Sequence, residues 1–192
     1  ASYDYDGEAH GEDNATYTEN FDAKVTVSGL KGSDALTSIT LNGQETNAGV
    51  YTGKIAASAA AVGNATGNYT IRYVVGDLTI NQLDSLTVEL GSSGYDYDGD
   101  AHALENAATT NEIGGETTIL YALSEDAAED AWTEDLNSLT ATNVTDSKTI
   151  YVKATNPNYS NVATGSATLT IRPVTLTVTA KAQSYDYDGE AH

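Results

Sequence analysis

The residues able to do chemistry are concentrated in one motif that occurs three times. Ser2–His10 (Ser-Tyr-Asp-Tyr-Asp-Gly-Glu-Ala-His) returns letter for letter at Ser184–His192, and Tyr95–His102 differs from it only by Asp100 in place of Glu. The copies hold all 3 His of the chain and, with two each, a large share of its 13 Tyr. Carboxylates, an imidazole and phenol rings within so short a segment suit a structural turn, a cation site or acid–base chemistry.

The structural interpretation starts from the alternation of the motif. In a strand, Tyr3 and Tyr5 would lie on one face and Asp4 and Asp6 on the other, and Asp-Gly then favours a tight turn. His10 would form a hydrogen bond or a cap within the same turn. In this interpretation the tyrosine rings of the motif pack against the module, and its Asp-Gly pair forms a turn.

The calcium interpretation uses the same alternating carboxylates, because hard cations bind several oxygen ligands from one loop. In the first copy, Ser2 would take the first position of such a loop and Asp13 the twelfth. In the second copy, Glu105 would take the twelfth position, but Gly94 stands at the first and offers no side-chain ligand. The fit is therefore partial, and Ca²⁺ is the one cofactor that the sequence suggests. The candidate metal ligands are Asp4, Asp6, Glu8, Asp96, Asp98 and Asp100.

The catalytic interpretation needs an Asp–His acid–base pair. Each motif offers one His, and the chain has neither a Gly-x-Ser-x-Gly nucleophile turn nor a His-Glu-x-x-His pair. Asp and Glu are so frequent in this sequence that it neither identifies nor excludes a pair of catalytic carboxylates of the glycosidase type. We predict no catalytic residues, and therefore that the protein is not an enzyme.

Trp132 is the single tryptophan and lies in an acidic stretch, residues 124–136. An aromatic ring in a loop can stack on a sugar, and it can equally plug the core. Trp132 is our candidate binding residue for a glycan, with the core plug as the alternative.

The repeats divide the chain into modules of about 90 residues. Asn68-Tyr69 is echoed by Asn158-Tyr159, and Leu78-Thr79-Ile80 by Leu169-Thr170-Ile171. Strand-like segments precede the second and third motifs, but nothing comparable precedes Ser2. We expect a first β module at 1–82 that lacks its own first strand, a second at 83–173, and the first strand and motif of a third at 174–192. The chain would then be part of a longer array.

Thr, Val, Ile and Tyr alternate or cluster in most segments, which favours half-buried strands. We expect short helices only at 124–136 and, with weaker signals, at 56–62, and a hairpin turn at Asn42-Gly43. The predicted strands are 24–27, 36–41, 69–75, 86–90, 117–121, 149–153, 167–171 and 174–178. The predicted fold is all-β, with tandem Ig-like β-sandwich modules, or alternatively β-grasp-like modules with one short helix.

Composition excludes several classes. The chain has 192 residues, no Cys, and 28 Asp and Glu against 8 Lys and Arg, a net charge of −20. Without cysteine there is no disulfide framework or thiolate site. So acidic a surface repels phosphate backbones and anionic headgroups, and no apolar run reaches the roughly 20 residues of a membrane span. We expect neither nucleic-acid binding nor membrane insertion in this segment.

The order of motifs carries a resemblance. Tyr-Asp-Gly-x-x-His after a Thr/Val strand, a Trp loop, residues 151–159 (Tyr-Val-Lys-Ala-Thr-Asn-Pro-Asn-Tyr) and a closing Thr-Leu-Thr-Ile strand at 168–171 resemble the tandem Tyr-Asp-Gly-type (YDG/MBG-like) repeat modules of large bacterial cell-surface adhesins. The extra Asp before the usual Tyr-Asp-Gly departs from that pattern.

The resemblance implies a secreted or cell-wall protein on the bacterial surface, whose repeats form a stalk or filament that projects a functional tip. The implied partners are neighbouring modules of the same chain. Lateral self-association and adhesion to a host glycan or protein stay open as alternatives.

Overall fold

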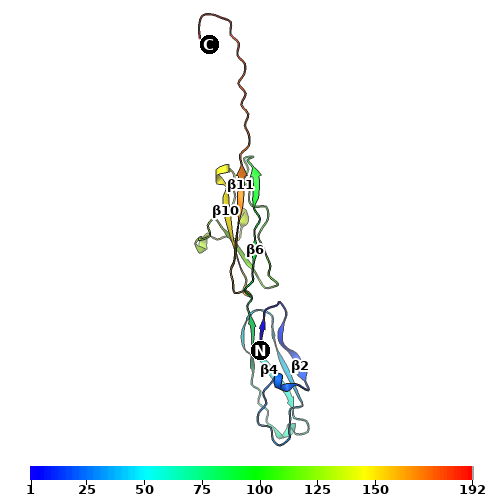
Figure 1. Ribbon diagram of the computed structural model, residues 1–192. Helices are drawn as coiled ribbons and strands as arrows, with labels where there is room; N and C mark the ends of the chain where they lie inside the picture. Colours follow the sequence, from blue (N-terminus) through cyan, green and yellow to red (C-terminus); the bar gives the residue numbers. More distant parts are fainter. Residues whose placement is uncertain (192) are drawn as a thin grey trace.

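The computed structural model describes residues 1–191 and consists of two elongated β modules placed end to end, followed by an extended C-terminal segment (Figure 1). We call residues 1–82 module 1, residues 83–173 module 2 and residues 174–191 the tail. Strands arranged in three sheets make up most of the regular structure, which confirms the expectation of a mainly β protein.

Module 1 is one five-stranded sheet with the order β1-β5-β4-β3-β2. Its strands are β1 (Ser2–Asp4), β2 (His10–Tyr17), β3 (Ser38–Glu45), β4 (Gly49–Ala61) and β5 (Gly76–Asn81). The motif strand β1 runs parallel to β5, and the other neighbours are antiparallel. Leu78 and Ile80 of β5 are buried, as alternate residues on one face of a strand should be.

Module 2 has two sheets. The first, with the order β7-β11-β10-β9, contains β7 (Ser93–Asp96), β9 (Thr118–Ala122), β10 (Lys148–Thr155) and β11 (Ala163–Arg172). The second pairs β6 (Val88–Glu89) with β8 (Thr109–Thr110). A core of buried side chains that includes Leu104, Ile150, Val152 and Leu169 fills the module, and Val88 packs against it from β6.

The same parallel pairing recurs in both modules. The motif strand β7 lies parallel to β11 as β1 lies parallel to β5. The backbone N–H of Tyr5 donates to Asn81, and that of Tyr97 donates to Arg172. The motif tyrosine is thereby held at the same end of each module.

Module 1 differs from module 2 in its second layer. Within residues 1–82 there is no counterpart of β6, and β2, which follows the motif in module 1, pairs with β3 at the sheet edge. In module 2 the segment that follows the motif supplies β8, which pairs with β6. Because module 1 has no strand equivalent to β6, the segment after its motif must form its backbone hydrogen bonds with another strand, and it forms them with β3.

Several secondary-structure predictions are confirmed and others are wrong. The strands predicted at 117–121, 149–153 and 167–171 are β9, β10 and β11, and 36–41 and 86–90 lie partly in β3 and β6. Residues 24–27, 69–75 and 174–178 form no strand. Since module 1 has no second sheet, its segments 24–27 and 69–75 lack the neighbour against which they would pair.

The turn and helix predictions need correction as well. Asn42-Gly43 lies inside β3, where a Cβ on Gly43 would come within 2.1 Å of the Lys54 carbonyl oxygen, so the glycine permits close strand contact. Residues 56–61 belong to β4, because their pairing with β3 outweighs the helix preference of alanine. The only helical turns in segment 124–136 are 3₁₀ turns. The five 3₁₀ turns among residues 1–191 are η1 (Phe21–Ala23), η2 (Thr66–Asn68), η3 (Glu129–Ala131), η4 (Leu136–Ser138) and η5 (Val144–Asp146).

Candidate functional site: the repeated motif and the module junction

In each of its first two copies the motif folds into the same small aromatic turn. The ring of Tyr3 stacks on that of His10 with centroids 4.5 Å apart, and His10 Nε2 lies 2.9 Å from Asp6 Oδ1. In the second copy Tyr95 stacks on His102 at 4.2 Å, and His102 Nε2 lies 3.0 Å from Asp98. The local hydrogen bond expected for the histidine is therefore present in both.

The carboxylate of the turn is held by the backbone that follows it. Asp6 accepts the N–H of Glu8, and this bond, reinforced by the ring of His10, lowers the pKa of Asp6 below its usual value. The N–H of Asp100 and the ring of His102 lower the pKa of Asp98 in the same way. Gly7 has a φ of +85°, which a residue with a Cβ seldom adopts. The arrangement stabilises a turn and keeps its aspartate ionised.

The candidate calcium ligands contact different partners and do not converge on one point. Asp4 accepts from the side chain of Asn81, and Asp96 from that of Arg172, whereas Asp6 and Asp98 face their histidines. Glu8 and Asp100 are exposed and contribute backbone N–H groups to the turns. Among residues 1–191, no three His, Cys, Asp or Glu side chains gather closely enough to hold a metal ion. Calcium binding stays a prediction.

The second tyrosine of the motif has a different role from the first. Tyr5 is 3% exposed and packs edge-to-face against Tyr159 of module 2, with centroids 6.3 Å apart and planes at 72°. Ile80 of module 1 and Leu86, Ala154 and Ala163 belong to the same buried cluster. This cluster joins the two modules, and we call it the junction.

Hydrogen bonds complete the junction. The side chain of Asn158, 1% exposed, accepts the N–H of Ala48 at 2.8 Å and donates to Asn47 at 3.2 Å. The linker residue Gln82 donates to the carbonyl of Pro157. Leu83 pairs through its backbone with the residues on either side of Tyr159. The linker is thus pinned to module 2.

Glycines bring the junction surfaces close together. A Cβ on Gly114 would lie 2.7 Å from the Tyr5 hydroxyl oxygen, and one on Gly115 would lie 2.4 Å from Nδ2 of Asn158. The phenol of Tyr159 accepts the N–H of Ile113, which leads into the same loop. A side chain at Gly114 would press on Tyr5 of module 1, and one at Gly115 would displace the Asn158 amide from its position at the junction.

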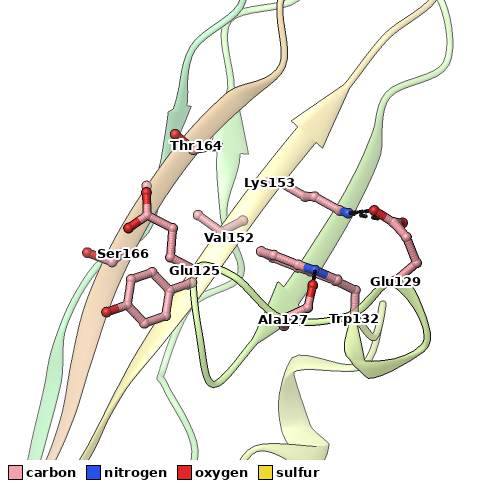
Figure 2. Close-up of a pocket in the computed structure, with 10 residues that line it drawn as sticks. Glu125, Ala127, Glu129, Trp132, Val152, Lys153, Thr164 and Ser166 are labelled. Atoms are coloured by element: carbon pink, nitrogen blue, oxygen red, sulfur yellow. Dashed lines mark hydrogen bonds and ion pairs between the residues drawn. The ribbon is translucent and has the colours of Figure 1, made fainter.

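Trp132 lines a shallow hollow of about 330 Å³ beside β10 and β11 (Figure 2). Its indole N–H donates to the carbonyl of Ala127, and Nζ of Lys153 lies 4.4 Å from the ring centroid. Glu129 forms an ion pair with Lys153 across the hollow. The side chain is half-buried, and the contact of the ring with Lys153 of β10 ties the loop to the sheet.

The sequence pattern places Tyr5 on the same strand face as Tyr3 and does not indicate Asn158 and Tyr159 as partners across modules. The echo of Asn68-Tyr69 in Asn158-Tyr159 aligns the two repeats and does not by itself indicate a contact between them. A repeated Asn-Tyr pair close to a module boundary is the signal that could have indicated a junction.

Comparisons with known proteins give little further information. No family model matches the chain, and no curated protein matches it in sequence. A solved structure of the fibronectin(III)-like modules of CbhA from Clostridium thermocellum is 12% identical, with 81% of this chain and 88% of that chain covered and a TM-score of 0.30. An overlap this low carries no argument about function.

None of the helices in residues 1–191 is long and apolar enough to cross a membrane.

Proposed function

We propose that this chain is a structural segment of an extracellular bacterial surface adhesin, built from tandem β modules that form a stalk or filament, with the two sheets of an Ig-like sandwich in module 2 and a single sheet in module 1. The observation that carries the proposal is the junction, in which the motif tyrosine of module 1 is buried against module 2. A protein that needs reach gains it from modules that are held end to end, and the repeat supplies such modules.

The junction is built to resist bending. Flexible linkers expose their backbone and contact neither domain, whereas Leu83 is paired with module 2 on both sides of Tyr159. The buried Asn158 ties the β3–β4 loop of module 1 to the same point. Two modules linked in this way act as one rod.

The rod is long for its mass. The ten residues of β11 and the thirteen of β4 give strands of about 33 and 43 Å at roughly 3.3 Å a residue. Because these strands run along the long axis (Figure 1), each repeat adds most of its strand length to the reach. The net charge of −20 would keep neighbouring rods apart.

Small-angle X-ray scattering on the full chain tests the proposal. We expect an extended particle with a single well-defined maximum dimension, and Tyr5→Ala should broaden the distance distribution as the junction loosens. Tyr97→Ala is the matched control, because Tyr97 holds the same place in module 2 but is 42% exposed. A wild-type curve that requires freely hinged modules would refute the rod.

The Trp132 hollow favours a second function, adhesion to a host glycan or protein. A half-buried indole beside a lysine and a glutamate combines an apolar ring for a sugar with polar groups for its hydroxyls; Lys153 lies over one face of the ring, so a sugar would stack on the other face. Binding to a glycan array or to mucin, lost in Trp132→Ala and kept in Tyr187→Ala, would support it. Tyr187 is 98% exposed in the tail and serves as an aromatic control. A chain that binds nothing favours the spacer.

A further inference from the structure

The Trp132 hollow contains polar groups that the fold itself does not use. Its floor is the outer face of β10 and β11, where Tyr151 lies opposite Ser166 in the strand register. Lys153 lies opposite Thr164 one step further along the same face. The residues between them face the core of module 2. The floor therefore presents one aromatic ring, one amine and two aliphatic hydroxyls to a molecule that enters the hollow.

The charges of the hollow do not cancel. Glu129 forms an ion pair with Lys153, and Lys153 also lies over the ring of Trp132, so both of these charges are already engaged. Glu125 lines the same hollow, is exposed, and forms no hydrogen bond or ion pair with any other of residues 1–191. Its carboxylate is directed toward β11 (Figure 2). One negative charge of the hollow is therefore without a protein partner.

Tyr151 adds a second aromatic surface beside Trp132. Lys153 covers one face of the indole, whereas no ring or cation of the described chain packs on the ring of Tyr151. The hydroxyls of Tyr151, Thr164 and Ser166 make no hydrogen bond within residues 1–191. Aromatic rings flanked by available hydroxyls suit a sugar, which has an apolar face and a rim of hydroxyls.

We propose that the hollow binds an amino sugar whose amine is free and protonated, an inference that rests on the proposed adhesion to a glycan. The sugar contacts the open face of Trp132 and the ring of Tyr151. Its ammonium group pairs with Glu125, and its hydroxyls form hydrogen bonds with Thr164 and Ser166. A polysaccharide with unacetylated glucosamine units has this chemistry.

Charge favours this class of sugar over others. The chain has a net charge of −20, so it repels acidic sugars and attracts cationic ones. A sugar with an acetylated amine is neutral and lacks the ion pair with Glu125. A lysine side chain forms that pair, but it has no hydroxyls for Thr164 and Ser166. The volume of about 330 Å³ is at the lower end of the usual range for small-molecule sites, which suits a sugar unit.

Isothermal titration calorimetry of the full chain with three oligosaccharides of equal length tests the proposal. The three are built from glucosamine, N-acetylglucosamine and glucose, and they differ only in the group at one carbon. We expect the glucosamine form to bind about tenfold more tightly than the other two, the lower end of what a hydrogen bond to a charged group contributes. A preference for either neutral form would overturn the proposal.

Variants locate the binding. Glu125→Gln should remove the preference for glucosamine, whereas Tyr151→Thr should weaken all three oligosaccharides and Tyr151→Phe, which keeps the ring, should not. Glu134→Gln is the matched control, because Glu134 is an exposed glutamate in the same acidic stretch but does not line the hollow. Its affinity should stay within about twofold of wild type, since distant exposed charges are screened. Equal losses in Glu125→Gln and Glu134→Gln would mean that overall charge attracts the amine, and would overturn the proposal.

The inference and the adhesion on which it rests can fail separately. Equal binding of the three oligosaccharides, lost in Trp132→Ala, would overturn the amino-sugar assignment and leave adhesion to a glycan. A lysine-rich peptide that binds as tightly as the glucosamine form would make the occupant a protein, and would also overturn the assignment. A chain that binds none of these would remove both the inference and the adhesion, and the stalk would remain.

Discussion

Tyr5 of the first motif and Tyr159 of module 2 meet edge-to-face, with ring centroids 6.3 Å apart, although they are separated by most of the chain. Offset and edge-to-face aromatic pairs gain about 0.5–1.5 kcal/mol beyond their burial. The pair therefore couples the stability of the two modules. Tyr97, in the same place on module 2, keeps 42% of its surface exposed.

Asn158→Ala should uncouple the modules. The substitution removes the acceptor of the half-buried Ala48 N–H and the donor to the exposed amide of Asn47, and the loss of such a hydrogen bond costs about 0.5–1.5 kcal/mol. By differential scanning calorimetry we expect the wild type to melt in one transition and the variant in two, with the module 1 transition at the lower temperature. Asn137→Ala, at an exposed asparagine, is the control. An unchanged single transition in Asn158→Ala would show that the asparagine does not couple the modules.

The motif turn should lose its stabilising effect in acid. Because the pKa of Asp98 in the folded protein lies below the ordinary value of 3.8, its ionised form stabilises the fold above that pH. The contribution is lost as the pH falls through the lower, folded-state pKa. Asp98→Asn should therefore lower the melting temperature at pH 7, and the difference from wild type should shrink as the pH falls below 3.8. A difference that is constant from pH 7 to pH 2 would contradict the assignment.

The sequence predicted the motif turn well because the turn is local. Asp6, Gly7 and His10 lie within five positions, and their preferences for a turn, a positive φ and a nearby hydrogen bond act together. The strands of module 2 were also predictable, since buried residues alternate with more exposed ones along β10 and β11 and the apolar pattern follows directly from that alternation.

The junction and the fold of module 1 were not predictable in this way. Tyr5 and Tyr3 share a strand face by alternation, but β1 ends at Asp4 and Tyr5 turns toward module 2. Segment 69–75 has strong β preference and still forms no strand, because pairing depends on a neighbouring strand that module 1 does not hold. Both outcomes depend on contacts between distant residues.

Removal of calcium should leave the melting temperature of the protein unchanged. Asp4 is bound to Asn81 and Asp6 to its own turn, so a bound cation would have to displace contacts already made. We expect EDTA and added Ca²⁺ to give the same melting temperature within error, and Asp4→Asn to be neutral in both. A melting temperature that rises with Ca²⁺ in the wild type, and not in Asp4→Asn/Asp6→Asn, would establish the site that the sequence suggested.

Lys153 should contribute more to the free energy of unfolding through its contact with the ring of Trp132 than through its ion pair with Glu129. Its Nζ lies 4.4 Å from the indole centroid, and the lysine side chain is only 17% exposed, whereas that of Glu129 is 90% exposed. Exposed ion pairs contribute about 0–1 kcal/mol with a small median, while a cation over tryptophan contributes about 0.5–1 kcal/mol or more when partly desolvated.

Lys153→Met, which keeps the length of the side chain, should therefore lower the free energy of unfolding by about 1 kcal/mol, and Glu129→Gln by no more than a few tenths. Urea unfolding followed by the fluorescence of Trp132 measures both, since it is the only tryptophan. Raising the salt concentration should shrink the effect of Glu129→Gln more than that of Lys153→Met, because the exposed pair is screened and the ring contact is not. Equal losses in the two variants would mean that the ion pair, and not the ring, holds the lysine.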